Sequence, residues 1–433
     1  MAWKTGTAAG YIALLTALRD FAAARAVLSG AINVAGSGYS VNDVLTVVGG
    51  TGTVAATFNV DTIGGSGEVT AITLVEEGEY TVQPANPVAT TVAPAGGSGC
   101  TIDLTWHAKR GWTTDRDVVY SGTDRELIMH GEGDGTQAIY GGARTFQSGS
   151  NRAWELAGFT GYSAGDPWAT QPGISPGRYD GVGTAAEGAY VPLSTGTITY
   201  WFEVTTRWIF VLAKIGTTYV PCGFGFLDQF GTATEYPYPF LVLGACSDVA
   251  TVYSYSGAGF SGAVDPIGGV TDTYGPAFVR DPAGVWRTVK NGTATSSAGR
   301  NASQVCVVYP AGLPDWTAAE PEDRGWMQGT APLFITTKMV PNSGHPGTSA
   351  VEVMQTPGSP NDLCIPFPAT IIETDAPTFR IYGEIHGLFW VNSTLTSGNM
   401  VAEDTIAIGG DTYLVSQNCN RTDHFAFFCV KEE

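Results

Sequence analysis

The sequence predicts a mainly β protein, with antiparallel sheets in sandwich-like domains and one N-terminal amphipathic helix. Three observations support this fold class. The 433 residues include 57 glycines and 24 prolines. Together these two residue types make up nearly a fifth of the chain, against about 12% in an average protein. Such a high content of turn-forming residues is typical of short strands joined by turns. Aromatic residues make up 11% of the chain and suit the faces of sheets. Only one segment has the clear periodicity of an amphipathic helix.

Length and charge limit the number of domains and the class of partner. At roughly 100–200 residues per domain, we expect two to four domains. Charged residues make up 14% of the chain, below the usual ~25%, which indicates that part of the surface is covered by partners. The net charge of −19 disfavours direct binding of nucleic acid or of anionic membranes. No apolar run approaches about 18 residues, so we expect no membrane insertion.

The first predicted unit, residues 1–28, consists of the N-terminal helix, which we place at residues 8–28. Its apolar side chains recur at helical spacing and share one face, and they are Tyr11, Leu14, Leu15, Leu18 and Phe21. Thr7 is a plausible N-cap and Gly30 a plausible stop. We expect this face to lie on the protein's own sheet or on a neighbouring subunit.

The second predicted unit, residues 29–107, is a Gly-rich β-module with an internal repeat. Ile32-Asn33-Val34 matches Ile72-Thr73-Leu74, Gly38-Tyr39 matches Gly78-Glu79-Tyr80, and the closing GTGTVAATF matches GSGCTIDLT. Each copy alternates apolar and polar residues between Gly-rich turns, which predicts paired antiparallel strands. Two copies are too few for a long solenoid. We therefore expect a small two-lobed module that projects from the rest.

The third predicted unit, residues 108–433, is an aromatic-rich β core, for which a division into two subdomains near residues 250–300 is one option. The segment TITYWFEVTTRWIFVLAKIGTTYV predicts a hairpin that turns at Thr205-Thr206-Arg207. The other strand candidates are Glu126–Met129, Ala138–Ala143, Phe240–Leu243, Val305–Tyr309, Leu333–Thr337, Phe379–Ile385, Leu388–Val391 and Tyr413–Val415. The connections at 166–191 and 253–274 are long and Pro-rich, as in chains whose surfaces are covered by neighbours.

Residue patterns that could carry catalysis or bind a metal are weak. Gly161-Tyr162-Ser163-Ala164-Gly165 matches the GxSxG motif, but Asp166-Pro167 follows at once, where the motif needs a helix. The five histidines lack metal-binding spacing, and Glu132-Gly-Asp134 does not continue into a calcium loop. The seven cysteines are scattered without CxxC spacing, which favours buried free thiols. We predict no catalytic, cofactor-binding or metal-binding residues, and no enzyme activity.

Clusters of aromatic residues are the strongest remaining signal. Dense aromatic runs lie around the predicted hairpin and in the YPYPF segment, and they contain Trp201, Trp208, Tyr236, Tyr238 and Phe240. Core and interface packing is the favoured interpretation. A platform on which sugars of a host-surface glycan stack is the alternative. Together with the apolar face of the helix, these side chains are our candidates for subunit contacts.

Several segments, in this order, resemble a family of tailed-bacteriophage virion proteins. They are ELIMHGEGDGTQAIYGGARTF, NRAWELAGFTGYSAGDPWATQPG, ITYWFEVTTRWIFVLAKIGTTYVPCGFGF followed by TEYPYPFLVLG, and GEIHGLFWVNS with AEDTIAIGGDTYLVSQNCNRTDHFAFF. The similarity covers about residues 111–433 and the N-terminal helix. The GYSVNDVLTVVGGTGT segment resembles β-inserts of phage tail proteins, so residues 29–107 look like an inserted module.

The resemblance implies a structural protein of the tail tip, baseplate or neck, made in the host cytoplasm and located in the virion. Its implied partners are copies of itself, in a ring-like homo-oligomer, and other tail proteins. A host-glycan-binding tail module is the alternative function, and a hydrolase or depolymerase is a third. The resemblance brings no catalytic residues to this chain.

Overall fold

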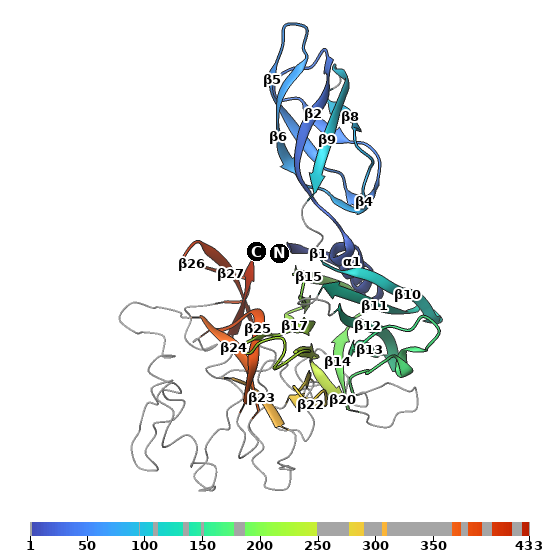
Figure 1. Cartoon of the computed structure of the whole chain (residues 1–433), viewed down its shortest axis with the longest axis vertical. Helices are drawn as coiled ribbons and strands as arrows, with labels where there is room; N and C mark the ends of the chain where they lie inside the picture. Colours follow the sequence, from blue (N-terminus) through green and yellow to red (C-terminus); the bar gives the residue numbers. More distant parts are fainter. Residues whose placement is uncertain are drawn as a thin grey trace.

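The computed structural model describes residues 2–94, 96–106, 111–132, 138–148, 151–176, 187–248, 277–289, 305–309, 366–373, 380–391, 401–417 and 427–432. A small lobe, formed by residues 27–106, projects from a larger body that holds both chain ends (Figure 1). The described chain is mainly β with antiparallel sheets and a single α-helix, which confirms the predicted fold class. No helix in these ranges is long and apolar enough to cross a membrane.

The body is built on a 14-stranded sheet that coils into a near-closed barrel. In spatial order it contains β1 (Ala2–Ala9), β15 (Thr197–Val204), β16 (Trp208–Ile215), β17 (Thr218–Phe226), β19 (Phe240–Leu243), β21 (Ala277–Arg280), β22 (Trp286–Val289), β23 (Val305–Tyr309), β24 (Pro366–Glu373), β25 (Arg380–Val391), β28 (Phe427–Glu432), β27 (Asp411–Gln417) and β26 (Thr405–Ile408), with β18 (Asp228–Gln229) on β25. Only the β22–β23 pair is parallel among the paired strands described. The inner face buries an apolar cluster that includes Trp208, Phe210, Tyr382 and Phe428.

A hydrogen-bonded contact joins early and late strands of this sheet. The carboxylate of Glu403, in the turn before β26, accepts hydrogen bonds from Lys214 of β16 and, at 2.7 Å, from Tyr219 of β17. The Lys214 ammonium and the Tyr219 hydroxyl hold the pKa of Glu403 below its usual value. Glu403 has a positive φ of 75°, a conformation that non-glycine residues rarely adopt. The turn therefore places this carboxylate at some cost in backbone energy.

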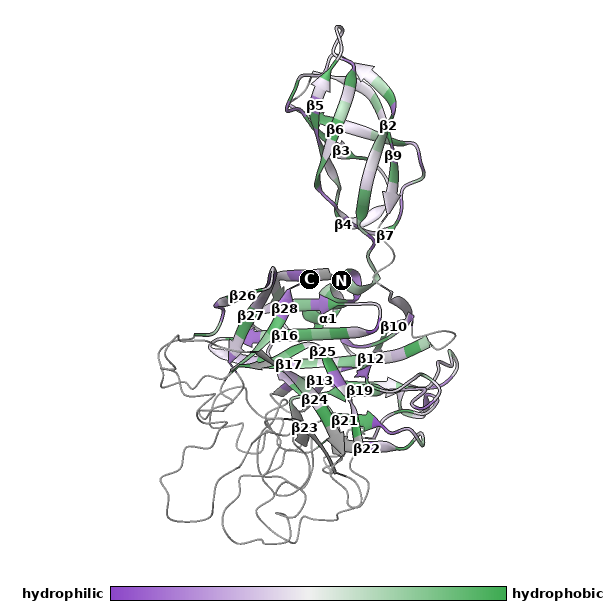
Figure 2. Ribbon diagram, turned by 60° about the vertical axis from the view of Figure 1, so that its left-hand side comes forward, coloured by the Kyte–Doolittle hydropathy of each residue, from purple (hydrophilic) through white to green (hydrophobic). Residues whose placement is uncertain are grey.

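A second sheet, with six strands, covers the outer face of the large sheet. It runs in the order β10 (Thr113–Ser121), β11 (Asp124–Glu132), β12 (Ala138–Ser148), β13 (Asn151–Phe159), β14 (Glu187–Leu193) and β20 (Cys246–Asp248). The two sheets and the helix enclose the largest apolar cluster, which contains Trp112, Trp154, Phe202, Phe224 and Phe240. Figure 2 shows apolar strands gathered in this part of the body.

The helix α1 (Tyr11–Ala23) buries the apolar face that its sequence predicts. Its buried side chains are Tyr11, Leu14, Leu15, Leu18, Phe21 and Ala22. The indole N–H of Trp154 donates a 2.8 Å hydrogen bond to the carbonyl of Tyr11, and the Tyr11 hydroxyl donates to Asp124 at 2.9 Å. The helix is thus joined to the six-stranded sheet by both packing and hydrogen bonds.

The predicted limits of the helix, residues 8–28, were wrong at both ends. Thr7 is not the N-cap, because it lies in β1 and pairs with Thr199, and the helix follows Gly10 at φ 92° without a side-chain cap. At the other end the backbone becomes extended at Ala24. Gly30 does not stop the helix but lies in a strand of the lobe, where a Cβ would come within 2.7 Å of Phe58 and Ile102.

Most strand candidates in the described body are confirmed. The hairpin arms are β15 and β16, and the residues between them are Thr205-Thr206-Arg207. The candidates Phe379–Ile385 and Leu388–Val391 were predicted as two strands, but their described residues, from Arg380 onward, belong to the single strand β25. Gly387 at φ 67° allows the chain to bend and continue within it. Leu333–Thr337 and the loop 253–274 lie outside the described residues.

The lobe contains two copies of one strand pattern that interlock. Its strands are β2 (Val27–Ser37), β3 (Val44–Val47), β4 (Thr51–Val54), β5 (Thr57–Ile63), β6 (Val69–Glu76), β7 (Glu79–Val82), β8 (Val88–Ala93) and β9 (Ser98–Trp106). The main sheet runs β2-β9-β8-β3-β5-β6, and β4 pairs with β7. Exchanging each strand for its counterpart, β2 for β6, β3 for β8 and β5 for β9, reverses this order. The lobe therefore has a pseudo-twofold axis between β3 and β8.

Two buried tyrosines occupy equivalent positions about this axis. The backbone N–H of Cys100 donates to the Tyr39 hydroxyl at 3.0 Å, and that of Ala56 donates to the Tyr80 hydroxyl at 2.8 Å. These bonds align Ala56–Val60 with Cys100–Leu104. The repeat predicted from sequence exists, but its closing segments match three residues away from the predicted alignment. The sequence alignment matched the glycines of the two segments. The structure instead matches the buried residues whose backbone N–H groups contact the two tyrosines.

A matched pair of leucine substitutions tests the role of the helix. Leu18 is 1% exposed in the body core and Leu28 is 52% exposed on the lobe. We expect Leu18→Ala to lower the free energy of unfolding by about 2–5 kcal/mol, whereas Leu28→Ala should change it by no more than about 0.5 kcal/mol. Urea unfolding followed by tryptophan fluorescence measures both. Equal effects of the two substitutions would contradict the placement of α1.

The pseudo-symmetry of the lobe predicts similar effects of Tyr39→Phe and Tyr80→Phe. Each change leaves a buried backbone N–H without its acceptor, at a cost of about 1–3 kcal/mol. Hydrogen exchange of the full chain should accelerate at the amide of Cys100 in the first variant and of Ala56 in the second. A loss of protection in only one variant would show that the two hydroxyls are not equivalent.

Candidate functional site

The ten residues predicted to contact other subunits lie within this chain's own core. The five helix residues pack in the core between the sheets. Phe240 is fully buried in the same core, and Tyr238 packs against it. Trp201, Trp208 and Tyr236 belong to the barrel interior. Their contacts are accounted for within the chain, so a surface for a partner must be sought elsewhere in the molecule.

A row of alternating charges crosses the outer face of the six-stranded sheet. It is formed by Arg116 of β10, Glu126 of β11, Arg144 of β12 and Glu155 of β13. Arg116 Nη2 lies 2.7 Å from Glu126 Oε2, and Arg144 Nη2 lies 2.6 Å from Glu155 Oε2. Glu126, Arg144 and Glu155 are buried, Glu155 completely. Burial opposes the charge of Arg144, yet the adjacent Glu155 raises the pKa of its guanidinium.

The loop after β13 covers this row and contains the GxSxG match. The indole N–H of Trp168 donates to Glu155 at 3.3 Å, and the Trp168 ring lies 5.7 Å from the Arg144 guanidinium. Gln171 accepts from the Ser163 N–H at 2.9 Å and donates to the carbonyls of Ser163 and Asp166. Ser163 therefore lies in a bend held by Gln171, and a one-turn 3₁₀ helix, Trp168–Thr170, follows it. It is not placed on a strand-to-helix elbow.

Two histidines in the described part of the chain make similar pairs with carboxylates. His130 Nδ1 lies 2.7 Å from Asp115 Oδ2, and His386 Nδ1 lies 2.6 Å from Asp228 Oδ2. Glu384 is the strand partner of Asp228, and burial, together with the Asp228 charge, raises the pKa of Glu384. His107, His345 and His424 lie outside the described residues. Within those residues no three His, Cys, Asp or Glu side chains gather as metal ligands.

Cys100, Cys222 and Cys429 are buried in the interior. Cys100 and Cys222 are free thiols. Burial raises the pKa of the Cys222 thiol far above its usual value and also raises that of Cys100. Such thiols are poor nucleophiles, because the thiolate is the reactive form.

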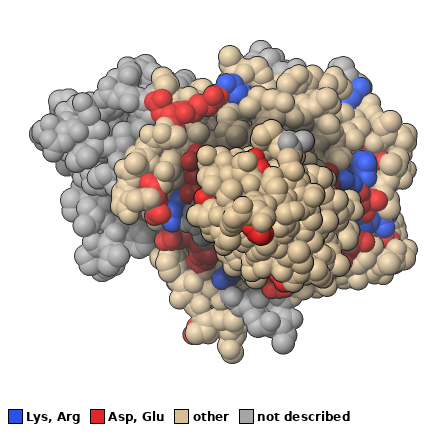
Figure 3. All heavy atoms as spheres, turned by 90° about the horizontal axis from the view of Figure 1, so that it is seen from above, with Lys and Arg blue, Asp and Glu red and all other residues tan. Residues whose placement is uncertain are grey.

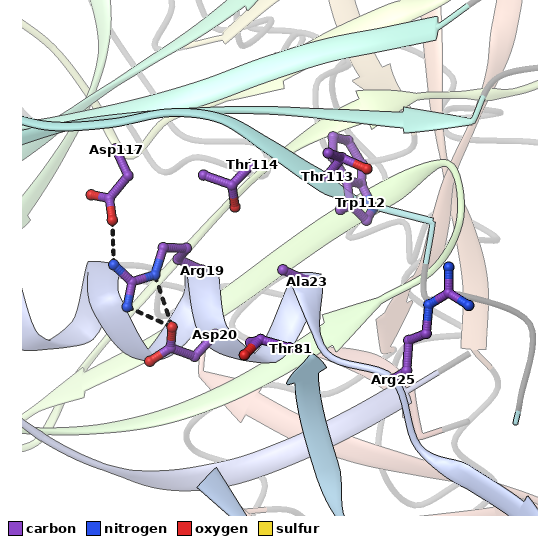
Figure 4. Close-up of a pocket in the computed structure, with 9 residues that line it drawn as sticks. All are labelled: Arg19, Asp20, Ala23, Arg25, Thr81, Trp112, Thr113, Thr114 and Asp117. Atoms are coloured by element: carbon purple, nitrogen blue, oxygen red, sulfur yellow. Dashed lines mark hydrogen bonds and ion pairs between the residues drawn. The ribbon is translucent and has the colours of Figure 1, made fainter. Parts of the chain in front are cut away.

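A cavity of about 500 Å³ opens where the helix, β10 and the lobe meet (Figure 4). Arg19 of the helix pairs with Asp20 and with Asp117 of β10, and Arg125 lies 2.5 Å from the other oxygen of Asp117. Burial works against ionisation of Asp117, but hydrogen bonds from both guanidinium groups hold its pKa below the usual value. Thr81 and Arg25 line the cavity from the side of the lobe and its connection.

The lobe has the most distinctive surface. Residues 27–106 contain seven Asp or Glu residues and no Lys, Arg or His. In the end-on view of Figure 3, its face is largely free of charged atoms, with scattered acidic ones. The lobe exposes several large aliphatic side chains, which include Leu28, Val34, Val41, Val48, Val54, Ile63, Val75 and Val82. In contrast, the rings of Tyr39, Phe58 and Tyr80 are buried, and Trp106 packs against Tyr80.

Sequence reasoning missed this surface for a simple reason. We looked for partner-binding residues among the largest side chains, whereas the lobe exposes small and aliphatic ones. The absence of cations over 80 consecutive residues is visible in the sequence and was the available signal. No known protein-family model matches the chain, and no curated protein matches it.

The charge row predicts a strong contrast between single and double substitutions. Arg144→Met should destabilise the protein by about 3–5 kcal/mol, because it leaves Glu155 charged and buried, while the double variant Arg144→Met/Glu155→Leu should regain most of that loss. The more exposed pair Lys214–Glu403 is the control, and Lys214→Met should cost at most about 1 kcal/mol. Chemical unfolding measures all three. A double variant no more stable than Arg144→Met would contradict this description of the row.

Proposed function

We propose that this protein is a structural component of a bacteriophage particle, located in the tail, baseplate or neck. It acts by packing against copies of itself, in a ring-like assembly, and against other tail proteins. The observation that carries the proposal is the projecting lobe with its cation-free surface, added to a β body whose sequence segments resemble tail proteins in their order. The lobe offers this chain a surface for contacts that is separate from the body.

The surface of the lobe suits burial against a protein. Long side chains such as Lys and Arg lose much conformational entropy when an interface orders them. The lobe exposes none of these cations, and half of the exposed large apolar side chains in the described residues belong to it. A partner that covers this surface would gain apolar burial with little loss of side-chain entropy.

The charge row and the loop that contains Ser163 support packing better than catalysis. The buried carboxylates of the charge row are occupied by guanidinium groups and by an indole N–H. Ser163 is fixed in a loop by Gln171. Groups already paired in this way stabilise strand register and loop position, and they offer no prepared proton acceptor to a substrate.

Contact with the host surface by the lobe is the second candidate. The lobe projects from the body (Figure 1), and its outer strands expose hydroxyl and carboxylate groups, such as the Ser29–Thr105 and Asn33–Asp103 pairs. These groups could hydrogen-bond to sugars. The aromatic stacking platform that we considered from the sequence would use the body residues Trp201, Trp208, Tyr236, Tyr238 and Phe240, and all of these except the half-buried Tyr238 are buried.

Removal of the lobe separates the two candidates. Val27 and Trp106 are strand partners, so a short Gly-Ser linker can replace residues 27–106. We expect the full chain to form a ring-like oligomer in solution and to appear as a symmetric ring in electron micrographs of intact particles. The shortened chain should keep the fold of the body, because the body core contains none of the lobe's residues.

The outcomes of this experiment are distinct. Host-cell binding by the isolated full chain, lost on removal of the lobe, would favour the second candidate. A monomeric chain that is missing from purified particles would contradict the proposed function.

A further inference from the structure

The lobe and the body meet through few contacts. The helix ends at Ala23, and from Arg25 onward the chain belongs to the lobe, because Arg25 and Tyr80 exchange two backbone hydrogen bonds of 2.8 and 2.9 Å. Only Ala24 separates these two units on this side of the connection. The other connection, residues 107–110, lies outside the described residues. On the described side the neck is therefore the single residue Ala24, and a short connection crossed by few contacts permits rotation of one unit relative to the other.

One ion pair joins the two units within the described residues. Lys4 Nζ of β1 lies 2.6 Å from Glu79 Oε2 of β7, and the two side chains are 25% and 13% exposed. The same carboxylate oxygen accepts a 2.5 Å hydrogen bond from the Thr53 hydroxyl of β4. The Lys4 ammonium also lies 5.5 Å from the centre of the Phe21 ring. The pair is thus positioned by neighbours on both sides of the junction.

Space for movement lies beside this contact. The cavity of about 500 Å³ is lined by Arg19 and Ala23 of the helix and by Thr81 of the lobe. Figure 4 shows Thr81 at the end of its strand, facing the helix, with Arg25 to one side. A rotation of the lobe about Ala24 would widen or close this cavity without disturbing either apolar core.

We propose that the Lys4–Glu79 pair is a clasp that fixes the orientation of the lobe, and that the lobe pivots at the neck when the pair is broken. Glu79 has no acidic counterpart about the pseudo-twofold axis, because Gly38 occupies the equivalent place before Tyr39. The clasp is therefore a feature of the body-facing end of the lobe alone. This inference rests on the junction itself and does not depend on the proposed function.

Charge reversal in the full-length protein tests the clasp. Spin labels introduced through unnatural amino acids at Ser66, near the tip of the lobe, and at Thr232, on the body, report the distance between the two units. In the unaltered chain we expect a single narrow distribution of distances. Lys4→Glu and Glu79→Lys should each abolish that narrow peak, and the double variant Lys4→Glu/Glu79→Lys should restore it.

Glu76→Lys is the matched control, since Glu76 is an exposed acid of the neighbouring strand β6. It changes the charge of the lobe by the same amount and should leave the distribution narrow. Circular dichroism confirms that each variant keeps its β structure. A narrow distribution in both single variants, or a broad one in the double variant, would overturn the proposal.

Discussion

Burial of one face of a 13-residue helix between two sheets is the constraint on which the rest of the fold depends. For this face to be buried, β1 must come before the helix at the edge of the large sheet. The connection to the lobe must also begin at the end of the helix that lies beside β10. That geometry determines where the lobe emerges. It also explains why a short N-terminal segment contacts both sheets, and why the Tyr11 carbonyl and hydroxyl both have buried partners.

The two parts of the molecule use different means of stability. The body relies on large aromatic side chains and on a few deeply paired charges, of which the Arg144–Glu155 pair is the most buried. The lobe is too small for such a core and interlocks two copies of one strand pattern around Tyr39, Tyr80 and Phe58. Because β2 pairs with β9 and β6 with β5, each copy completes the other.

Local patterns in the sequence predicted the local structure well. The face of the helix and the hairpin at Thr205-Thr206-Arg207 could be predicted because each depends on neighbours a few residues away. β1 was missed because its Thr, Gly and Ala residues carry no alternation, and its pairing with β15 is long-range. The charge row was missed for the same reason, since Arg116 and Glu155 are brought to one face only by strand pairing. Core and interface packing was the favoured interpretation of the aromatic clusters, and they were also candidates for subunit contacts; in the structure they fill the interior of the body itself.

The strand order of the lobe also bears on how this gene could change. The hairpin turn at 64–68 joins β5 to β6 at the place that the pseudo-twofold axis relates to the neck, which joins β9 and β2 to the body. The turn and the neck therefore occupy equivalent ends of the lobe. One end accepts the chain connections to the body, so the other end can accept inserted chain in the same way. Extra sequence, whether a further duplicated unit or a foreign peptide, could therefore be inserted at Gly65, where a side chain meets open space, and extend from the far end of the lobe without rearranging the parts beneath it.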